Sequence, residues 1–305
     1  MISRRQLLKG ILASIGAVAA LGIGYGVGVE QFFAPRITRY QLRPARWPSG
    51  LDLRIAVLSD IHACRPWMSP ERIRSIVETA NGLEADLIVL LGDYVYGHRF
   101  VTDYLQPSEW SRELARLRAP LGVHSILGNH DWWKDDAVQQ RGEGPPFAKR
   151  ALHDVGIAVY ENEVVRLHKG GAAFWLAGLG DQLAFGVPFR EKPARRIGVD
   201  DLPGTLAKVT DEAPIILLAH EPDIMVDVPE RVSLVLSGHT HGGQVRLFGW
   251  LPWVPSRFGR RFAYGHVREQ TDLIVTCGLG CTIAPIRLGV PPEIAVVTLS
   301  GSAKS

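Results

Sequence analysis

Short apolar runs, each followed by a polar break, divide the chain from residue 53 onward into alternating strands and helices. Leu53 to Leu58 is almost continuously apolar, as buried strands are, and a second such run spans residues 86–91. Between them Ser69-Pro70-Glu71 is typical of a helix N-terminus, and we expect that helix to reach about Asn81. Strand, helix and strand in this order predict a parallel β-α-β unit.

The same alternation continues to about residue 159, after which the strands shorten. We expect Ser108 to cap a helix through Leu117, a strand to follow at 123–127, and the Gly-Pro break at Pro145 to precede a helix ending at Gly156. Residues 164–167 and 174–179, joined by a Lys-Gly-Gly turn, predict a hairpin. Further strands are predicted at 215–218, 234–236, 244–247, 273–276 and 294–299. No internal repeat interrupts residues 51–300, which we therefore interpret as one α/β domain of two sheets.

The amino-terminal segment differs from the rest. Residues 10–29 are free of charge until Glu30 and long enough to cross a bilayer as a helix. The preceding Ser3-Arg4-Arg5-Gln6-Leu7-Leu8-Lys9 resembles the bacterial twin-arginine export signal, which implies the twin-arginine translocase as a partner. The alternative is an ordinary membrane anchor with a basic flank. Both interpretations assign residues 1–33 to a signal or anchor and put the domain outside the cytoplasmic membrane, in the periplasm or cell wall; cleavage stays open.

Composition adds limits to this picture. The net charge of the 305 residues is only +3 and the cations are scattered, so no nucleic-acid partner is implied. Residues 34–50 contain several arginines and predict a solvated linker, with attraction to anionic lipid as the alternative; residues 301–305 are a tail. Three cysteines are too few for a disulfide framework, and Cys64, Cys277 and Cys281 are expected to be small packing residues.

Five of the predicted strands run directly into residues that can bind metal ions. Any one of them is better explained as a turn former, but five in order along one chain are not. Carboxyl ends of strands in an open α/β sheet meet at one edge, so these side chains are expected to converge there. Gly92, Gly128 and Gly238 are expected to let the backbone turn sharply. The residues concerned are Asp60, His62, Asp93, Asn129, His220, His239 and His241.

The motifs D-x-H, G-D, G-N-H-D, H and G-H-x-H that these residues form resemble those of the calcineurin-like metallophosphoesterase superfamily. Residues 238–244 and 278–293 are similar to its exported or membrane-associated bacterial branch, typified by YkuE and YaeI. The resemblance implies a four-layer α-β-β-α sandwich of two mixed sheets, the metallo-dependent phosphatase fold. It also implies that Asp60, His62 and His241 hold one divalent metal, that Asn129, His220 and His239 hold another, and that Asp93 bridges the two.

The resemblance further implies hydrolysis of phosphate esters by a hydroxide that bridges the metals. His130 would protonate the leaving oxygen or stabilise phosphoryl charge, and Asp131 would orient the His130 imidazole. Mixed imidazole and carboxylate ligands suit Mn, Zn or Fe, in that order of preference. A phosphodiester of a lipid or cell-envelope component is the leading substrate class, with phosphomonoesters as the other.

Two alternatives stay open: a UDP-2,3-diacylglucosamine pyrophosphatase-like hydrolase, and a non-catalytic scaffold of the same fold. Scaffolds lose ligands, whereas all the ligand positions are filled here. The other histidines match no motif and are expected to be bystanders, although His98 follows Asp93 closely enough to touch substrate. Residues 248–262 mix aromatics with arginines, and they either pack against the core or contact a lipid interface.

Overall fold

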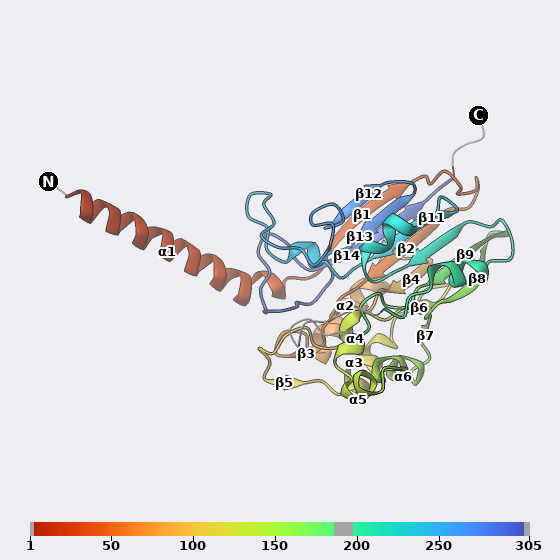
Figure 1. Ribbon diagram of the computed structural model, residues 1–305, viewed down its shortest axis with the longest axis horizontal. Helices are drawn as coiled ribbons and strands as arrows, with labels where there is room; N and C mark the ends of the chain where they lie inside the picture. Colours follow the sequence, from red (N-terminus) through yellow and green to blue (C-terminus); the bar gives the residue numbers. More distant parts are fainter. Residues whose placement is uncertain (1–2, 186–197, 302–305) are drawn as a thin grey trace.

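The computed structural model describes residues 3–185 and 198–301 and consists of two six-stranded sheets packed face to face (Figure 1). The first sheet has the order β1 (Arg36–Leu42), β14 (Glu293–Leu299), β2 (Leu53–Leu58), β4 (Leu87–Leu90), β6 (Val123–Ser125) and β7 (Ala158–Val159). The second has the order β12 (Gly265–Arg268), β13 (Asp272–Val275), β11 (Val232–Ser237), β10 (Ile215–Leu218), β9 (Ala172–Gly178) and β8 (Glu163–Lys169). A separate small ribbon pairs β3 (Cys64–Arg65) with β5 (Asp103–Tyr104).

Helices cover the outer faces of both sheets, so the expected four layers are present, and both sheets are mixed. Helices α2 (Pro70–Asn81), α3 (Pro107–Leu114), α4 (Asn129–Trp133), α5 (Asp136–Arg141) and α6 (Phe147–His153) share one apolar cluster with the first sheet. The layer on the second sheet is thinner in the described part of the chain. It consists of α7 (Leu202–Ala207), the 3₁₀ turn η2 (Pro222–Asp227) and irregular loops.

The alternation of side chains along each central strand explains why the sheets stack. In β2, Leu53, Ile55 and Val57 enter the cluster between the two sheets, while Ala56 and Leu58 join the cluster beneath the helices. Successive strand residues point to opposite faces, and a strand covered on both faces must be apolar throughout. The continuous apolar runs in the sequence therefore mark strands that are buried on both sides.

Most of the predicted elements are confirmed. The β2-α2-β4 unit is parallel and α2 has the predicted bounds, with Ser69 as its N-cap. The hairpin β8–β9 is antiparallel as expected. Helix α3 is capped by Gln106 and Glu109 rather than by Ser108, and it ends at Leu114.

Two expectations are wrong. Within residues 34–50, expected to be a solvated linker, residues 36–42 form β1, which pairs in parallel with β14 along its whole length. Residues 244–247 form no strand, since only single bridges to Leu288 and Trp250 are made there. Strand β1 forms because of a pairing partner that is distant in the sequence, and residues 244–247 lack a continuous pairing partner. The local sequence pattern shows neither fact.

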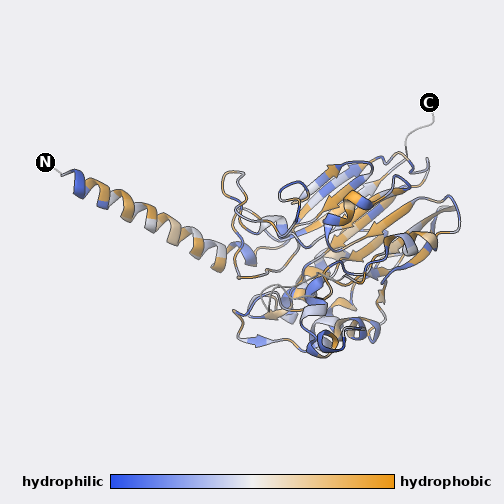
Figure 2. Cartoon of the chain, in the orientation of Figure 1, coloured by the Kyte–Doolittle hydropathy of each residue, from blue (hydrophilic) through white to orange (hydrophobic). Residues whose placement is uncertain are grey.

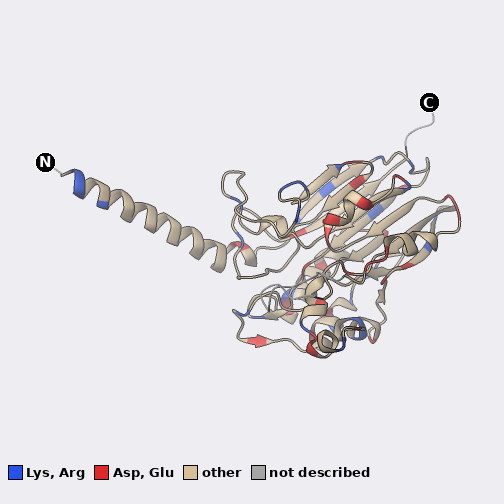
Figure 3. Ribbon diagram, in the orientation of Figure 1, with Lys and Arg blue, Asp and Glu red and all other residues tan. Residues whose placement is uncertain are grey.

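Helix α1 (Arg4–Gly28) extends away from the domain (Figure 1) and continues into the 3₁₀ turn η1 (Glu30–Phe32). The segment Arg4–Phe32 is the only part of the described chain that is a helix long and apolar enough to cross a membrane. It is apolar on all sides (Figure 2), and its Lys and Arg residues lie at the free end (Figure 3). The predicted apolar segment is therefore one continuous helix.

A buried arginine organises the loop before β14. Arg287 is fully buried, and its guanidinium donates hydrogen bonds to four backbone carbonyls, those of Cys277, Gly278, Gly280 and Val290. Of these carbonyls only Gly278 O also accepts a backbone hydrogen bond, from Glu293 N–H at 3.0 Å, and leaving the others unpaired away from water is unfavourable. Arg287 thus replaces the hydrogen bonds that a strand would have supplied.

We predict that Arg287→Met lowers the free energy of unfolding by about 3 to 5 kcal/mol, because it leaves buried carbonyls without a donor. Urea unfolding followed by circular dichroism measures the change. The control is Arg268→Met, whose side chain is 68% exposed, and which should change stability by less than about 0.5 kcal/mol. Equal losses in both variants would contradict the role of Arg287.

Candidate metal centre

The carboxyl ends of five strands deliver the candidate ligands to one edge of the two sheets. Strands β2, β4 and β6 run parallel in the first sheet and precede Asp60 with His62, Asp93, and Asn129. Strands β10 and β11 run parallel in the second sheet and precede His220, and His239 with His241. Two stacked sheets with their strand ends at the same edge therefore build one polar cluster from distant parts of the sequence.

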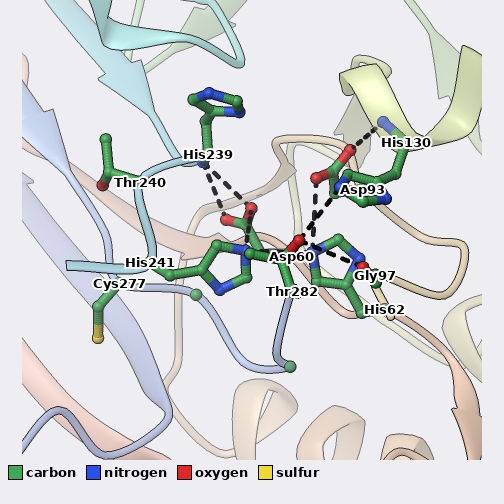
Figure 4. Close-up of polar contacts among 12 residues, drawn as sticks. Asp60, His62, Asp93, Gly97, His130, His239, Thr240, His241, Cys277 and Thr282 are labelled. Atoms are coloured by element: carbon green, nitrogen blue, oxygen red, sulfur yellow. Dashed lines mark hydrogen bonds and ion pairs between the residues drawn. The ribbon is translucent and has the colours of Figure 1, made fainter. Parts of the chain in front are cut away.

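The first group consists of Asp60, His62, Asp93 and His241, all of them buried. Their donor atoms lie within 4.8 Å of one another. His62 Nε2 is 3.1 Å from His241 Nε2, which is in turn 3.3 Å from Asp60 Oδ1. Figure 4 shows these imidazoles and carboxylates turned towards one another, while the His239 ring points away from them.

The second group consists of His220, Glu221 and His239, to which Asn129 is joined. The Asn129 Oδ1 atom is 2.9 Å from His239 Nδ1. Asp93 connects the two groups, because its Oδ2 atom lies 3.5 Å from His62 Nε2 and 3.4 Å from His220 Nε2. The structure thus brings together all seven residues that the sequence singled out as metal ligands.

Backbone carbonyls determine which nitrogen of two imidazoles faces the cluster. His62 Nδ1 lies 2.9 Å from Val95 O, and His220 Nδ1 lies 2.6 Å from Leu91 O. A carbonyl only accepts, so each Nδ1 carries a proton and each Nε2 is the ring nitrogen that faces Asp93. A cation between these Nε2 atoms and the carboxylate oxygens makes the arrangement favourable. The donor set fits divalent metal ions by this test.

The electrostatics of the side chains alone support the same conclusion. Burial by itself would lower the pKa of His220 and raise that of Asp93. Their mutual attraction outweighs burial, so the pKa of His220 lies well above its ordinary value and that of Asp93 well below. The buried Asp93 carboxylate needs a positive partner. A metal ion that binds here takes that role and displaces a proton from the ligands.

Most of the ligands adopt a backbone conformation that is unusual for them. Asp60, His62, Asp93, His239 and His241 have φ between 49° and 66°, in the left-handed region. That conformation is disfavoured by roughly 1 to 2 kcal/mol for a residue with a Cβ. Residues held this way cluster at functional sites, where surrounding structure enforces them. Here it turns each strand end sharply so that neighbouring ligands point inward.

Two of the three glycines act differently from what the sequence suggested. Gly92 has a φ of 94° and does turn the backbone, but Gly128 and Gly238 do not have positive φ. They are needed because a neighbouring group lies too close for a side chain. A Cβ on Gly128 would be 2.4 Å from Asp93 Oδ1, and one on Gly238 would be 2.0 Å from Ser59 Oγ.

Asp131 does not orient His130, so that expectation is wrong. Its carboxylate accepts backbone N–H groups of Asp93, Tyr94, Val95 and Gly128 at 2.9 to 3.3 Å. Asp131 therefore fixes the loop that carries the central ligand. The His130 imidazole instead places Nε2 3.2 Å from Thr282 Oγ1, and its backbone N–H donates to Asp93 Oδ1 at 2.8 Å.

Two buried carboxylates at the second group were not predicted from the sequence, Glu221 within the group and Asp181 next to it. Glu221 follows the ligand His220 directly, and Asp181 follows β9. Burial raises the pKa of each, and Glu221 raises the pKa of Asp181 further, whereas His220 and the hydrogen bond with Asp181 lower the pKa of Glu221. Glu221 Oε1 has no hydrogen-bond partner and lies 4.0 Å from His239 Nδ1. Asp181 has the same sequence signal as the other ligands, because it too follows a predicted buried strand.

Other residues lie largely as expected. Cys64, Cys277 and Cys281 are free, buried thiols. His98 is buried next to the first group, where burial, then His62 and Lys134, lower its pKa to about 4. A Cβ on its neighbour Gly97 would be 2.9 Å from His62 Nδ1, so this loop packs directly against a ligand.

Comparison with known proteins agrees with this geometry. The model of the calcineurin-like phosphoesterase family matches residues 53–243, which contain every ligand described above. The uncharacterized metallophosphoesterase YkuE of Bacillus subtilis is 31% identical over 313 aligned positions that cover 99% of each chain. An uncharacterized metallophosphoesterase of Aquifex aeolicus is 29% identical over 90% of this chain and 94% of its own. A zebrafish (Danio rerio) transmembrane protein with a metallophosphoesterase domain is 29% identical over 97% of this chain and 63% of its own.

We predict that chelation of divalent metal lowers Tm by roughly 5 to 10 °C, because ligand lone pairs are then left facing one another. Differential scanning fluorimetry before and after chelation, with metal added back, measures the shift. Asp93→Ala should have a low Tm that no longer responds to chelator. The matched control Asp103→Ala, whose side chain is 68% exposed, should respond as the unmodified protein does. A chelator response retained by Asp93→Ala would contradict the central position of Asp93.

Proposed function

Because the chain belongs to the calcineurin-like phosphoesterase family, we propose that it is a phosphodiesterase that uses two divalent metal ions and acts outside the cytoplasmic membrane. The observation that carries the proposal is the position of Asp93, whose Oδ2 atom is nearly equidistant from His62 Nε2 and His220 Nε2. One carboxylate oxygen between two imidazole lone pairs is the arrangement expected of a ligand shared by two ions.

In this proposal Asp60, His62 and His241 would hold one ion, Asn129, His220 and His239 would hold the other, and Asp93 would be available to both. Such ions supply an activated water and neutralise phosphoryl charge when bound. The mixed imidazole and carboxylate donors favour Mn, then Zn or Fe. Glu221 belongs to the second group and adds a carboxylate to the ligands there.

The chain itself contributes the groups that handle the substrate. His130 lies at the edge of the first group, with its ring 4.8 Å from that of His62, and its Nδ1 atom has no hydrogen-bond partner. Thr282 Oγ1 holds the other ring nitrogen at 3.2 Å. We assign His130 to protonation of the leaving oxygen, or to stabilisation of the phosphoryl oxygens.

We predict that His130→Ala keeps near-normal metal content but loses about a hundredfold to ten-thousandfold in kcat on a diester with a poor leaving group. If His130 donates a proton, the loss should shrink as the leaving-group pKa falls. If it stabilises phosphoryl charge, the loss should be similar for all leaving groups. Steady-state rates on a series of aryl and alkyl diesters, with metal analysis of each preparation, measure both quantities.

The control for this experiment is His153→Ala, an exposed histidine on α6, which should leave the rate unchanged. Loss of metal from His130→Ala would make His130 a ligand. An unchanged rate for every leaving group would remove it from the mechanism.

The proposed location rests on the amino-terminal segment. Ser3 caps α1, and Arg4 and Arg5 begin it, ahead of the apolar part of the helix. The twin-arginine route carries folded proteins, which suits a domain that acquires its metals before export. With the basic end inside, α1 leaves the phosphoesterase domain on the outer side of the membrane.

We predict that a reporter fused after Ser305 is exported only when Arg4 and Arg5 are present and the twin-arginine translocase is active. The double substitution Arg4→Lys with Arg5→Lys keeps the charge and removes the paired arginines. Cell fractionation should find the variant retained inside. The control Arg36→Lys with Arg39→Lys, in β1, should be exported normally. Normal export of the first variant would reduce the segment to a plain anchor.

A further inference from the structure

The end of α1 is fixed to the domain rather than tethered loosely. Gly26 O accepts a hydrogen bond from the Arg287 backbone N–H at 3.2 Å, and Glu30 Oε2 accepts one from Gly289 N–H at 2.9 Å. Gln31 Nε2 donates to Pro285 O at 2.9 Å. A Cβ on Gly26 would be 2.8 Å from Arg287 O, so the helix and loop 284–289 are in close contact. The point where α1 leaves the domain is therefore set by this loop.

The same loop reaches the candidate active site within a few residues. Thr282 Oγ1 contacts His130 Nε2, and Thr282 N–H donates to Gln244 Oε1 at 2.5 Å. Ile283 N–H donates to Gly97 O at 3.2 Å. Figure 4 shows Thr282 and Gly97 beside His62. Residues 282–289 consequently connect the end of α1 to His130 at the metal centre.

Exposed apolar side chains concentrate around this point. We call six of them the apolar rim: Phe100, Leu247, Phe248, Trp250, Trp253 and Ile283. Phe248 is completely exposed, and Trp250 and Trp253 are each more than half exposed. Outside the rim and residues 3–33, only two other large apolar side chains of the described chain are exposed, Tyr104 and Val226. A soluble surface rarely gathers aromatic residues in this way.

Backbone and ring contacts connect the rim to the helix end. Arg246 N–H donates to Leu288 O at 2.7 Å, which joins the 247–253 loop to the loop that holds α1. Trp67 Nε1 donates to Phe100 O at 2.5 Å, and the Trp67 ring lies 5.6 Å from that of Phe32. Figure 1 shows the helix end and these loops on one side of the domain.

The two chain segments that carry five of the six rim residues have no carboxylate of their own, although Asp223 pairs with Arg257 at 3.8 Å. Neither residues 231–268 nor residues 279–292 contain an Asp or Glu, whereas the first range carries Arg246, Arg257 and Arg260 near the aromatic loop. Tryptophan side chains favour the boundary between lipid and water, and arginines there are attracted to anionic headgroups. The rim thus has the chemistry of a surface that lies against a membrane.

We infer that the apolar rim inserts into the surface of the same bilayer that α1 crosses and holds the His130 side of the metal centre towards the headgroup layer. A bilayer is the occupant because α1 enters lipid from the place where the rim lies, so that lipid covers the rim whenever α1 is inserted. The substrate then comes from the headgroup layer as a phosphate ester carried by an amphiphile; this consequence rests on the proposed function.

Site-specific labelling tests the inference without relying on activity. The full-length, metal-loaded chain carrying Trp250→Cys is labelled with an environment-sensitive nitrobenzoxadiazole group and reconstituted into vesicles of phosphatidylcholine and phosphatidylglycerol. The native cysteines are buried and are not labelled. The control position is Glu212→Cys, where the native side chain is 92% exposed. Glu212 precedes the amino end of β10, whereas the metal ligands follow the carboxyl ends of the strands.

The expected result is a blue-shifted emission at position 250 that nitroxide-labelled lipids quench and aqueous iodide does not, with the reverse at position 212. Adding Phe248→Ser and Trp253→Ser to the labelled Trp250→Cys chain should weaken the lipid quenching severalfold while metal content stays unchanged. Equal iodide access at both positions would overturn the inference. Shielding from iodide without quenching by lipid nitroxides would also overturn it, because a second copy or another protein would then cover the rim.

Discussion

Two backbone carbonyls, Leu91 O and Val95 O, determine the chemistry of the metal centre. By accepting from Nδ1 of His220 and His62 they turn both Nε2 lone pairs towards Asp93. The carbonyls belong to the segment that carries Asp93 itself, so the central carboxylate and the orientation of its neighbours are set by one stretch of backbone. The Asp131 carboxylate in turn holds that stretch by accepting hydrogen bonds from the backbone N–H groups of Asp93 and Tyr94. A single loop after β4 thus positions ligands from both sheets.

The arrangement requires the two sheets to approach very closely at their edge. The missing side chains of Gly128 and Gly238 and the left-handed backbone at five ligands are both consequences of that approach. The destabilisation is offset by the apolar strands directly behind the site, which are buried on both faces. A rigid core is therefore what allows strained ligands to keep their positions.

The ligands could be predicted from the sequence because each one follows a continuous apolar run, a signal contained within about ten residues. The same signal precedes Asp181, which follows β9. Other features depend on partners that are distant in the chain. Strand β1 reads as a basic linker because its pairing with β14 lies more than 250 positions away. The role of Asp131 follows from N–H groups that gather only when β4 and β6 lie side by side, and no spacing of residues encodes that.

The position of β14 affects how the first sheet can form during synthesis. Strand β14 lies between β1 and β2, the first two strands of the described chain, and Glu293 at its start accepts hydrogen bonds from Thr38 and Thr276. On the ribosome, the first sheet therefore has a gap in its interior until β14 emerges, and β1 has no neighbour to pair with. The nascent domain is an incomplete sheet with open edges until that strand is inserted.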